Sequence, residues 1–149
     1  MRSADSAKIG VEVIMFNTKI AIVVREDLAT WQKLNVTAFL TSGVVGATPG
    51  LLGERYEDAA GNTYNSLVIQ PIIVLSADAE TIQAIYGRAM EFGARLSLYI
   101  EEMFSTGHDA ANRAAVKQYE PASMNVVGLA LREDRKLVDK ITKGARMHA

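Results

Sequence analysis

Acidic side chains gather where two predicted strands end. Asp27 follows an apolar stretch at 19–25, and Glu101 and Glu102 follow another at 95–100. In open α/β sheets, ligands bind beyond the carboxyl ends of the strands, so these carboxylates could converge on one crevice. Because neighbouring residues on a strand point to opposite faces, only one of the two glutamates can line a given crevice. A solvated rim or a capping role is the plainer interpretation of the same residues.

The helix predicted after the first strand would add further side chains to this crevice. It carries Lys33 and Asn35, and it begins with Trp31, the only tryptophan of the chain. Trp31 could form a wall of the crevice or simply pack over the sheet edge. His108 lies in a polar loop, where plain solvation competes with a role as an acid, a base or a ligand.

Several common chemistries find no support in the sequence. There is no cysteine, and His108 and His148 are too far apart in the chain for a His-x-x-x-His pair, so no metal site is expected. The Gly-x-Ser-x-Gly elbow of serine hydrolases and the Gly-Lys-Ser/Thr of a phosphate-binding loop are both missing. We expect no cofactor.

Composition sets the class of protein. Hydrophobic residues make up 49% of the 149 residues and charged residues 22%, which excludes global disorder and suits a single domain over 1–149. Residues 1–7 are expected to fray. No apolar run approaches the roughly 20 residues of a membrane span, so we expect a cytoplasmic protein without membrane contact.

The charge balance gives no general attraction to polyanions. The net charge is -1, so no overall field favours nucleic acid or an anionic membrane. Residues 132–149 carry six basic and three acidic side chains, a local excess of +3. This excess leaves nucleic-acid binding open but not favoured, because a solvated terminal helix explains it as well.

Apolar stretches alternate with helical patterns along the chain. Strands are expected at 19–25, 67–75, 95–100 and 125–131, and helices near 30–45, 78–93, 105–118 and 133–143. This alternation predicts an α/β protein whose mixed sheet is covered on both faces, with an antiparallel connection allowed between the last two strands. Pro71 cannot donate to a ladder, so the second strand should lie at an edge or carry a bulge.

Local signals sharpen three of these elements. The first helix should turn Trp31, Leu34, Ala38 and Val45 to one side. In the second helix, Asp78 is a good N-cap, Ile82, Ile85, Ala89 and Phe92 recur at helical spacing, and Gly93 suits the end. The Ala60-Gly61-Asn62 triplet predicts a tight turn inside a long connection.

Several segments together resemble a known family. IAIVVREDL followed by WQKLNVTAFLTSG is similar to the opening of domain-of-unknown-function family 2000, a distant relative of the peptidyl-tRNA hydrolase II fold. The likeness continues through VLSADAETIQAIYGRAMEFGARLSLYIEE and PASMNVVGLALREDRKLVDKITKG, and it covers roughly 18–145. It implies a three-layer α/β/α fold with a mixed four-stranded sheet, and often a homodimer.

The resemblance also implies what has changed in the site. Peptidyl-tRNA hydrolases of this type carry a lysine on the helix after the first strand and a glutamine one turn later. Those positions match Asn35 and Phe39 here, with Lys33 as a displaced substitute. The acidic residue after the third strand is matched by Glu101 or Glu102. Losing a cation and an amide removes groups that hold a polyanion and stabilise an oxyanion, so we expect the parent activity to be lost.

Three hypotheses follow. The first is a protein that binds a small polar ligand in the rebuilt crevice, with the His108 loop as part of the wall and a contact set of Asp27, Trp31, Lys33, Asn35, Glu101 and Glu102. The second is a hydrolase of peptidyl-tRNA or a related ester, with Glu102 or His108 as the general base and Lys33 or Asn35 orienting the carbonyl. The third is a homo-oligomeric interaction protein without catalysis, assembled through the sheet edge or the Leu51–Leu52 loop.

Overall fold

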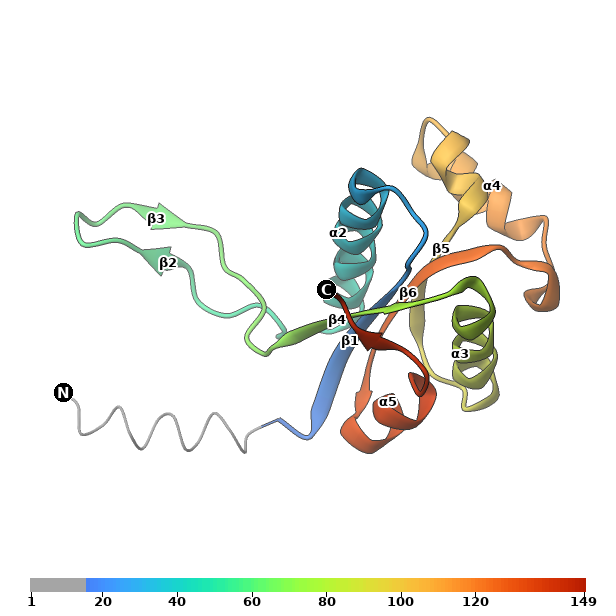
Figure 1. Ribbon diagram of the computed structural model, residues 1–149. Helices are drawn as coiled ribbons and strands as arrows, with labels where there is room; N and C mark the ends of the chain where they lie inside the picture. Colours follow the sequence, from blue (N-terminus) through green and yellow to red (C-terminus); the bar gives the residue numbers. More distant parts are fainter. Residues whose placement is uncertain (1–15) are drawn as a thin grey trace.

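A computed structural model describes residues 16–149, and its centre is one twisted sheet (Figure 1). The strands are β1 (Thr18–Arg25), β4 (Ile72–Ala77), β5 (Leu96–Ile100), β6 (Val126–Asp134) and β7 (Arg146–Met147), in the spatial order β5-β6-β1-β4-β7. β1 and β4 are parallel, whereas β6 is antiparallel to both β1 and β5, and β7 is antiparallel to β4. The expected mixed sheet and its antiparallel last pair are therefore confirmed.

The number of strands in the sheet differs from the prediction of four. Gly144 has a φ of 101°, which turns the chain back so that Arg146 and Met147 pair with Ser76 and Leu75. This two-residue strand, β7, makes the sheet five-stranded. A strand of two residues, one of them charged, has no periodicity to predict it from. The expected fraying of 1–7 lies outside the described residues.

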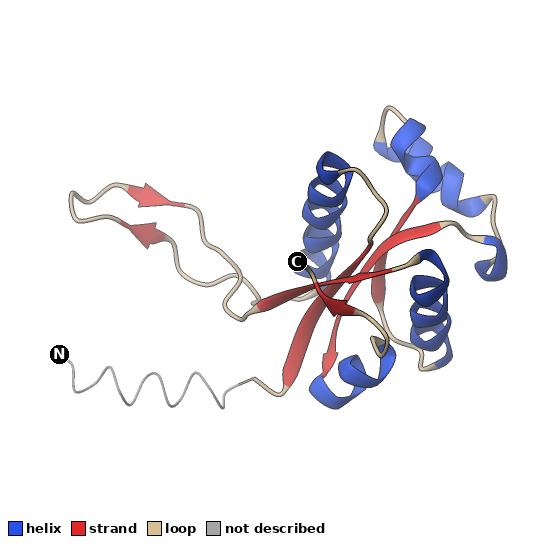
Figure 2. Cartoon of the chain, in the orientation of Figure 1, coloured by secondary structure: helices blue, strands red, loops and turns tan. Residues whose placement is uncertain are grey.

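Helices cover the two faces of the sheet (Figure 2). α2 (Thr30–Ala47) packs on the face that presents Ile20, Ile22 and Val24 of β1. α3 (Ala79–Glu91) and α5 (Arg135–Ile141) pack on the opposite face, against Ala21 and Val23. β1 is apolar at every position of this stretch because both of its faces are buried. The result is a three-layer α/β/α arrangement.

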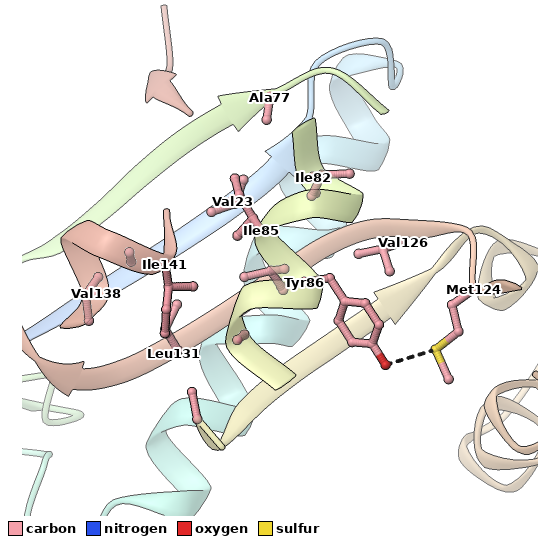
Figure 3. Packing of buried hydrophobic residues seen from close by; sticks show 14 of the residues in the cluster. Val23, Ala77, Ile82, Ile85, Tyr86, Met124, Val126, Leu131, Val138 and Ile141 are labelled. Atoms are coloured by element: carbon pink, nitrogen blue, oxygen red, sulfur yellow. Dashed lines mark hydrogen bonds between the residues drawn. The ribbon is translucent and has the colours of Figure 1, made fainter. Parts of the chain in front are cut away.

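α3 follows its sequence signals closely. The Asp78 side chain accepts a hydrogen bond from the Thr81 N–H at 2.8 Å, and Gly93 ends the helix with a φ of 68°. Ile82, Ile85 and Ala89 are buried in the core, where Figure 3 shows the first two beside Val23 and Tyr86. Phe92 is the exception, since it is 44% exposed and lies beneath the Lys140 ammonium group.

The inward face of α2 was predicted wrongly. The structure buries Val36, Leu40 and Val44, while Trp31 and Leu34 are 63% and 68% exposed. Apolar residues lie on every side of α2, among polar ones such as Lys33 and Asn35, so their spacing does not choose a side. Gly128 of β6 makes the choice, because a Cβ there would lie 2.5 Å from Val36 and 2.9 Å from Leu40. The helix can approach the sheet only over this glycine.

The connection between α2 and β4 forms a projecting hairpin (Figure 1). Its strands β2 (Tyr56–Glu57) and β3 (Thr63–Tyr64) pair with each other as a separate two-stranded sheet, and the predicted turn is present with Gly61 at a φ of 89°. The strand predicted from residue 67 begins at Ile72 instead, after Pro71. The Gln70 side chain is buried just before it, donates to the Thr18 carbonyl at 3.3 Å and accepts from Arg132 at 2.9 Å.

Candidate functional site

A cavity of about 730 Å³ lies between α2, β5 and the segment that follows β5. That segment is a short 3-10 helix, η1 (Glu101–Ser105), followed by α4 (Asp109–Lys117). α4 is the helix predicted near 105–118, and its N-cap is His108 rather than Asp109, because the His108 Nδ1 accepts the Ala111 N–H at 3.2 Å. With Nδ1 engaged in this way, the neutral ring carries its proton on Nε2.

Aromatic rings form the inner wall of this cavity. Trp31 and Phe104 meet edge to face with their centroids 6.0 Å apart, and Tyr99 lies 5.2 Å from Phe104 and 6.2 Å from Phe39. Tyr99 is only 6% exposed, and burial raises the pKa of its hydroxyl. Such clustered rings offer flat apolar surface to a planar ligand.

Polar side chains border the same cavity. Asn35 comes from α2, and Asn112, Arg113 and Lys117 come from α4. Arg113 forms an ion pair with Asp109 one turn earlier on the helix. Among residues 16–149, no side chain or backbone group hydrogen-bonds the Asn35 amide, which is therefore free to meet a ligand. The cavity thus combines an apolar interior with donors and acceptors along its border.

A second polar region lies at the carboxyl ends of β1 and β5. The Arg25 guanidinium bonds Asp27 at 2.6 Å and Glu101 at 2.9 Å, and its side chain is 16% exposed. Burial disfavours the charge on Arg25, but the hydrogen bonds and charges of both carboxylates outweigh it and raise the pKa of the guanidinium. We call Arg25, Asp27 and Glu101 the arginine cluster. The cluster brings together two predicted site residues, Asp27 and Glu101, as expected, but both carboxylates are already paired with Arg25.

Glu102 is bound by a different partner from the arginine cluster. One carboxylate oxygen accepts a hydrogen bond from the Asn125 amide at 2.8 Å, while Oε1 is buried without a hydrogen-bond partner in the described part of the chain. Partial burial opposes its charge, but hydrogen bonds from its own backbone N–H and from Asn125 outweigh that and lower the pKa of Glu102. Its charge in turn raises the pKa of the Tyr119 hydroxyl.

A family model described as "Protein of unknown function (DUF2000)" matches residues 18–149. The chain belongs to this family. The family resemblance stated from the sequence is thereby confirmed, whereas the relation to peptidyl-tRNA hydrolase II stays a prediction.

The solved structures include a relative of this DUF2000 chain. A protein of unknown function from Agrobacterium tumefaciens is 59% identical, with a TM-score of 0.89, over 91% of this chain and 100% of the other. A search of curated proteins gave no match. These comparisons establish the family and the fold, and they name no ligand or reaction.

The structure of the DUF2000 chain separates the residues that the sequence grouped. Trp31, Asn35 and His108 border the cavity, whereas Lys33 and Glu102 do not. Asp27 and Glu101 meet in the arginine cluster. Five further residues of the cavity were not predicted from the sequence: Tyr99, Phe104, Asn112, Arg113 and Lys117. A signal for the rings existed in the YIEEMF segment, where aromatic residues flank the two glutamates.

The described residues offer neither a cluster of metal ligands nor a membrane-spanning helix. Within residues 16–149, no three histidine, aspartate or glutamate side chains gather closely enough to hold a metal ion. In the same part of the chain, no helix combines the length and the apolar character needed to cross a bilayer.

Proposed function

We propose that this DUF2000 protein binds a small molecule with a flat apolar body and a polar group. The observation that carries the proposal is the cavity of about 730 Å³, whose inner wall is aromatic and whose border is polar. Its volume falls within the range of roughly 300–1,000 Å³ typical of ligand pockets. The sequence predicted a small polar ligand; the aromatic wall adds that this ligand also has an apolar part, which would stack on the rings.

The charges around the cavity favour a neutral or anionic polar group. Arg113 and Asp109 offset each other, which leaves Lys117 as the remaining charge among the lysine, arginine, aspartate and glutamate side chains that border the cavity. The Asn35 amide offers one donor group and one acceptor, so it suits a carboxylate, a carbonyl or a hydroxyl equally. We therefore expect planar aromatic acids to bind more tightly than planar aromatic amines.

Trp31 allows a direct test, because it is the only tryptophan and borders the cavity. Titration with 8-anilinonaphthalene-1-sulfonate, a planar aromatic anion, should quench its fluorescence to saturation at one equivalent per chain. Phe104→Ala removes a ring that contacts both Trp31 and Tyr99, and it should weaken binding about tenfold, the effect of losing one aromatic contact.

Lys33→Ala is the matched control for this titration. Lys33 lies on the same helix as Trp31 but outside the cavity, so its removal should leave the affinity unchanged. Quenching that never saturates, or equal affinities of the Phe104 and Lys33 variants, would contradict the proposal. Circular dichroism of each variant separates a loss of binding from a loss of fold.

A hydrolase of peptidyl-tRNA or a related ester is the second candidate. The observation in its favour is Lys117, which brings an ammonium group to the cavity that holds Asn35, so the position of the lost lysine is partly compensated from α4. Against it, His108 borders the cavity but Glu102 does not, and the His108 Nδ1 already accepts a backbone hydrogen bond. Turnover of peptidyl-tRNA by the wild-type chain, abolished in Lys117→Ala, would decide for catalysis.

Two broader expectations from the sequence accompany this proposal. A peptidyl-tRNA hydrolase II-like ancestry is supported by the three-layer arrangement and by the order of strands and helices along the chain. The cytoplasmic location stays a prediction.

A further inference from the structure

The projecting hairpin has apolar side chains that the rest of residues 16–149 leaves exposed. We call residues 52–69 the arm; it is joined at its root by backbone hydrogen bonds from Gly53 to Leu67 and from Ile69 to Leu51. Tyr56, Tyr64 and Leu67 are between 52% and 59% exposed. Within the part of the chain that the structure describes, β2 and β3 make extensive contact only with each other, and Figure 2 shows the arm standing away from the sheet.

An isolated two-stranded hairpin is marginally stable in water, so the arm needs a surface to lie on. Its tip is nevertheless well ordered by hydrogen bonds. Asp58 accepts from the N–H groups of Ala60 and Asn62 at 2.9 Å and from the Tyr64 hydroxyl at 2.7 Å, and these bonds lower the pKa of Asp58 to about 2. A projecting element with an ordered tip and apolar sides is suited to docking.

α2 presents a second uncovered apolar surface. Its buried side holds Val36 and Leu40, and its outer side exposes Trp31, Leu34 and Phe39, each by more than half. Large apolar side chains that lie together on an exposed surface commonly mark a contact with another molecule. We call Trp31, Leu34 and Phe39 the outer face of α2.

We propose that two copies of this chain form a symmetric dimer in which the arm of each copy lies along the outer face of α2 of the other. The lengths agree: nine residues out and nine back give an arm of roughly 30 Å, and the 18 residues of α2 span roughly 27 Å. Because both surfaces occur on each copy, the exchange is reciprocal and closes as a dimer.

The area available also matches a stable dimer. The arm and the outer face together expose eight large apolar side chains, each offering on the order of 100 Å². Covering them on both copies buries roughly 1,600 Å², the usual size of a specific interface. A dimer assembled in this way goes beyond ligand binding. The outer face shares Trp31 and Phe39 with the wall of the cavity, whereas Leu34 and the arm do not line the cavity. Changes at Leu34 or in the arm therefore test the dimer separately from ligand binding.

Cross-linking tests the exchange cleanly, because the chain has no cysteine of its own. Chains carrying Leu34→Cys and Tyr56→Cys, with different affinity tags, are co-expressed and treated with a short bismaleimide. The mixed cross-linked species should exceed, by at least tenfold, that from Leu34→Cys paired with Glu91→Cys. Glu91 is exposed on α3, on the opposite face of the sheet. Equal yields from the two pairs would overturn the proposal.

Sedimentation supplies an independent measurement. The full chain should sediment as a dimer at micromolar concentration. Leu34→Glu, and a chain with 54–66 replaced by Asn-Gly, should each sediment as a folded monomer, as judged by circular dichroism. A wild-type monomer at 100 μM, or a dimer that persists in both variants, would equally overturn the exchange of arms.

Discussion

The aromatic cavity and the arginine cluster lie on neighbouring parts of the molecule, yet they use their polar groups in opposite ways. In the arginine cluster, Asp27 and Glu101 are both bound to the Arg25 guanidinium. In the cavity, which has a volume of about 730 Å³, the Asn35 side-chain amide has no hydrogen-bond partner within residues 16–149. The first region is complete in the free protein, and the second is open to a ligand.

This difference shows that residue type alone does not mark a site. Carboxylates near strand ends are the obvious candidates in the sequence, but Arg25, the last residue of β1, satisfies them. The more informative feature is a volume bordered by groups whose hydrogen bonds are unused. A change in the cavity should therefore affect ligand binding, and a change in the arginine cluster should affect stability.

The largest expected effect is at the close contact between α2 and β5 beside the cavity. In Gly43→Ala the new Cβ would lie 2.2 Å from the Ser97 hydroxyl oxygen and 3.0 Å from the Ser97 Cβ. Rotating the hydroxyl relieves the first contact only, so the helix must also shift slightly from the strand. We expect a loss of about 1–3 kcal/mol in the free energy of unfolding, as for other overpacked sites, together with weaker ligand binding. Urea denaturation measures the first effect and Trp31 fluorescence the second.

Gly46→Ala is the control on the same helix. Nothing lies within 4 Å of the Cβ position at Gly46, so alanine should raise stability by up to about 1 kcal/mol through helix propensity. Adding Ser97→Gly to Gly43→Ala should restore most of the lost stability. If the two glycine variants behaved alike, the contact with Ser97 would not limit the approach of α2.

The next effect concerns the arginine cluster. Arg25→Met keeps the apolar stem and removes the cation, which leaves Asp27 and Glu101 without their shared partner. We expect a loss of about 1 kcal/mol in unfolding free energy, since both carboxylates remain partly solvated, and no change in ligand affinity. Arg113→Met, which breaks the exposed pair with Asp109, should cost less stability but alter binding. The reverse pattern would contradict the division of roles.

The smallest effect is a pH dependence at Glu102. Its pKa in the folded protein lies below the ordinary value of 4.5, so its charge contributes stability that is present above that value and lost as the pH falls through the lowered pKa. Wild type should therefore lose more stability than Glu102→Gln between pH 6 and 3, by less than about 1 kcal/mol because the group is partly solvated. Parallel pH profiles of the two chains would show that Glu102 is not stabilised by its hydrogen bonds.

The elements that could be predicted are those with one dominant pattern. KIAIVVR is apolar throughout and matches a strand buried on both faces, and α3 has a cap, a spaced apolar side and a terminal glycine. The inward side of α2 could not be predicted, because its apolar residues surround the helix and Gly128, more than 80 positions later, decides the side. That choice exists only in the packed structure.

The candidate site could be predicted only in part. Trp31, Asn35 and His108 do border one cavity, although they come from segments far apart in the chain. Tyr99 and Phe104 were not predicted because each lies beside apolar residues, Ile100 and Met103, and an aromatic residue in such a stretch is more often core than cavity wall. The pairing of Asp27 and Glu101 through Arg25 depends on a side-chain geometry that spacing along the chain does not contain.

The short ribbon β7 has a consequence for handling the protein. Arg146 and Met147 occupy backbone groups on the outer margin of β4, and the His148 N–H bonds the Val74 carbonyl at 3.1 Å. Ending the chain after Gly144 would expose the edge of β4 and leave its backbone groups unpaired beside apolar side chains of the same strand. Bare margins of that kind recruit strands from other molecules. We therefore expect the truncated chain to fold but to aggregate in concentrated samples.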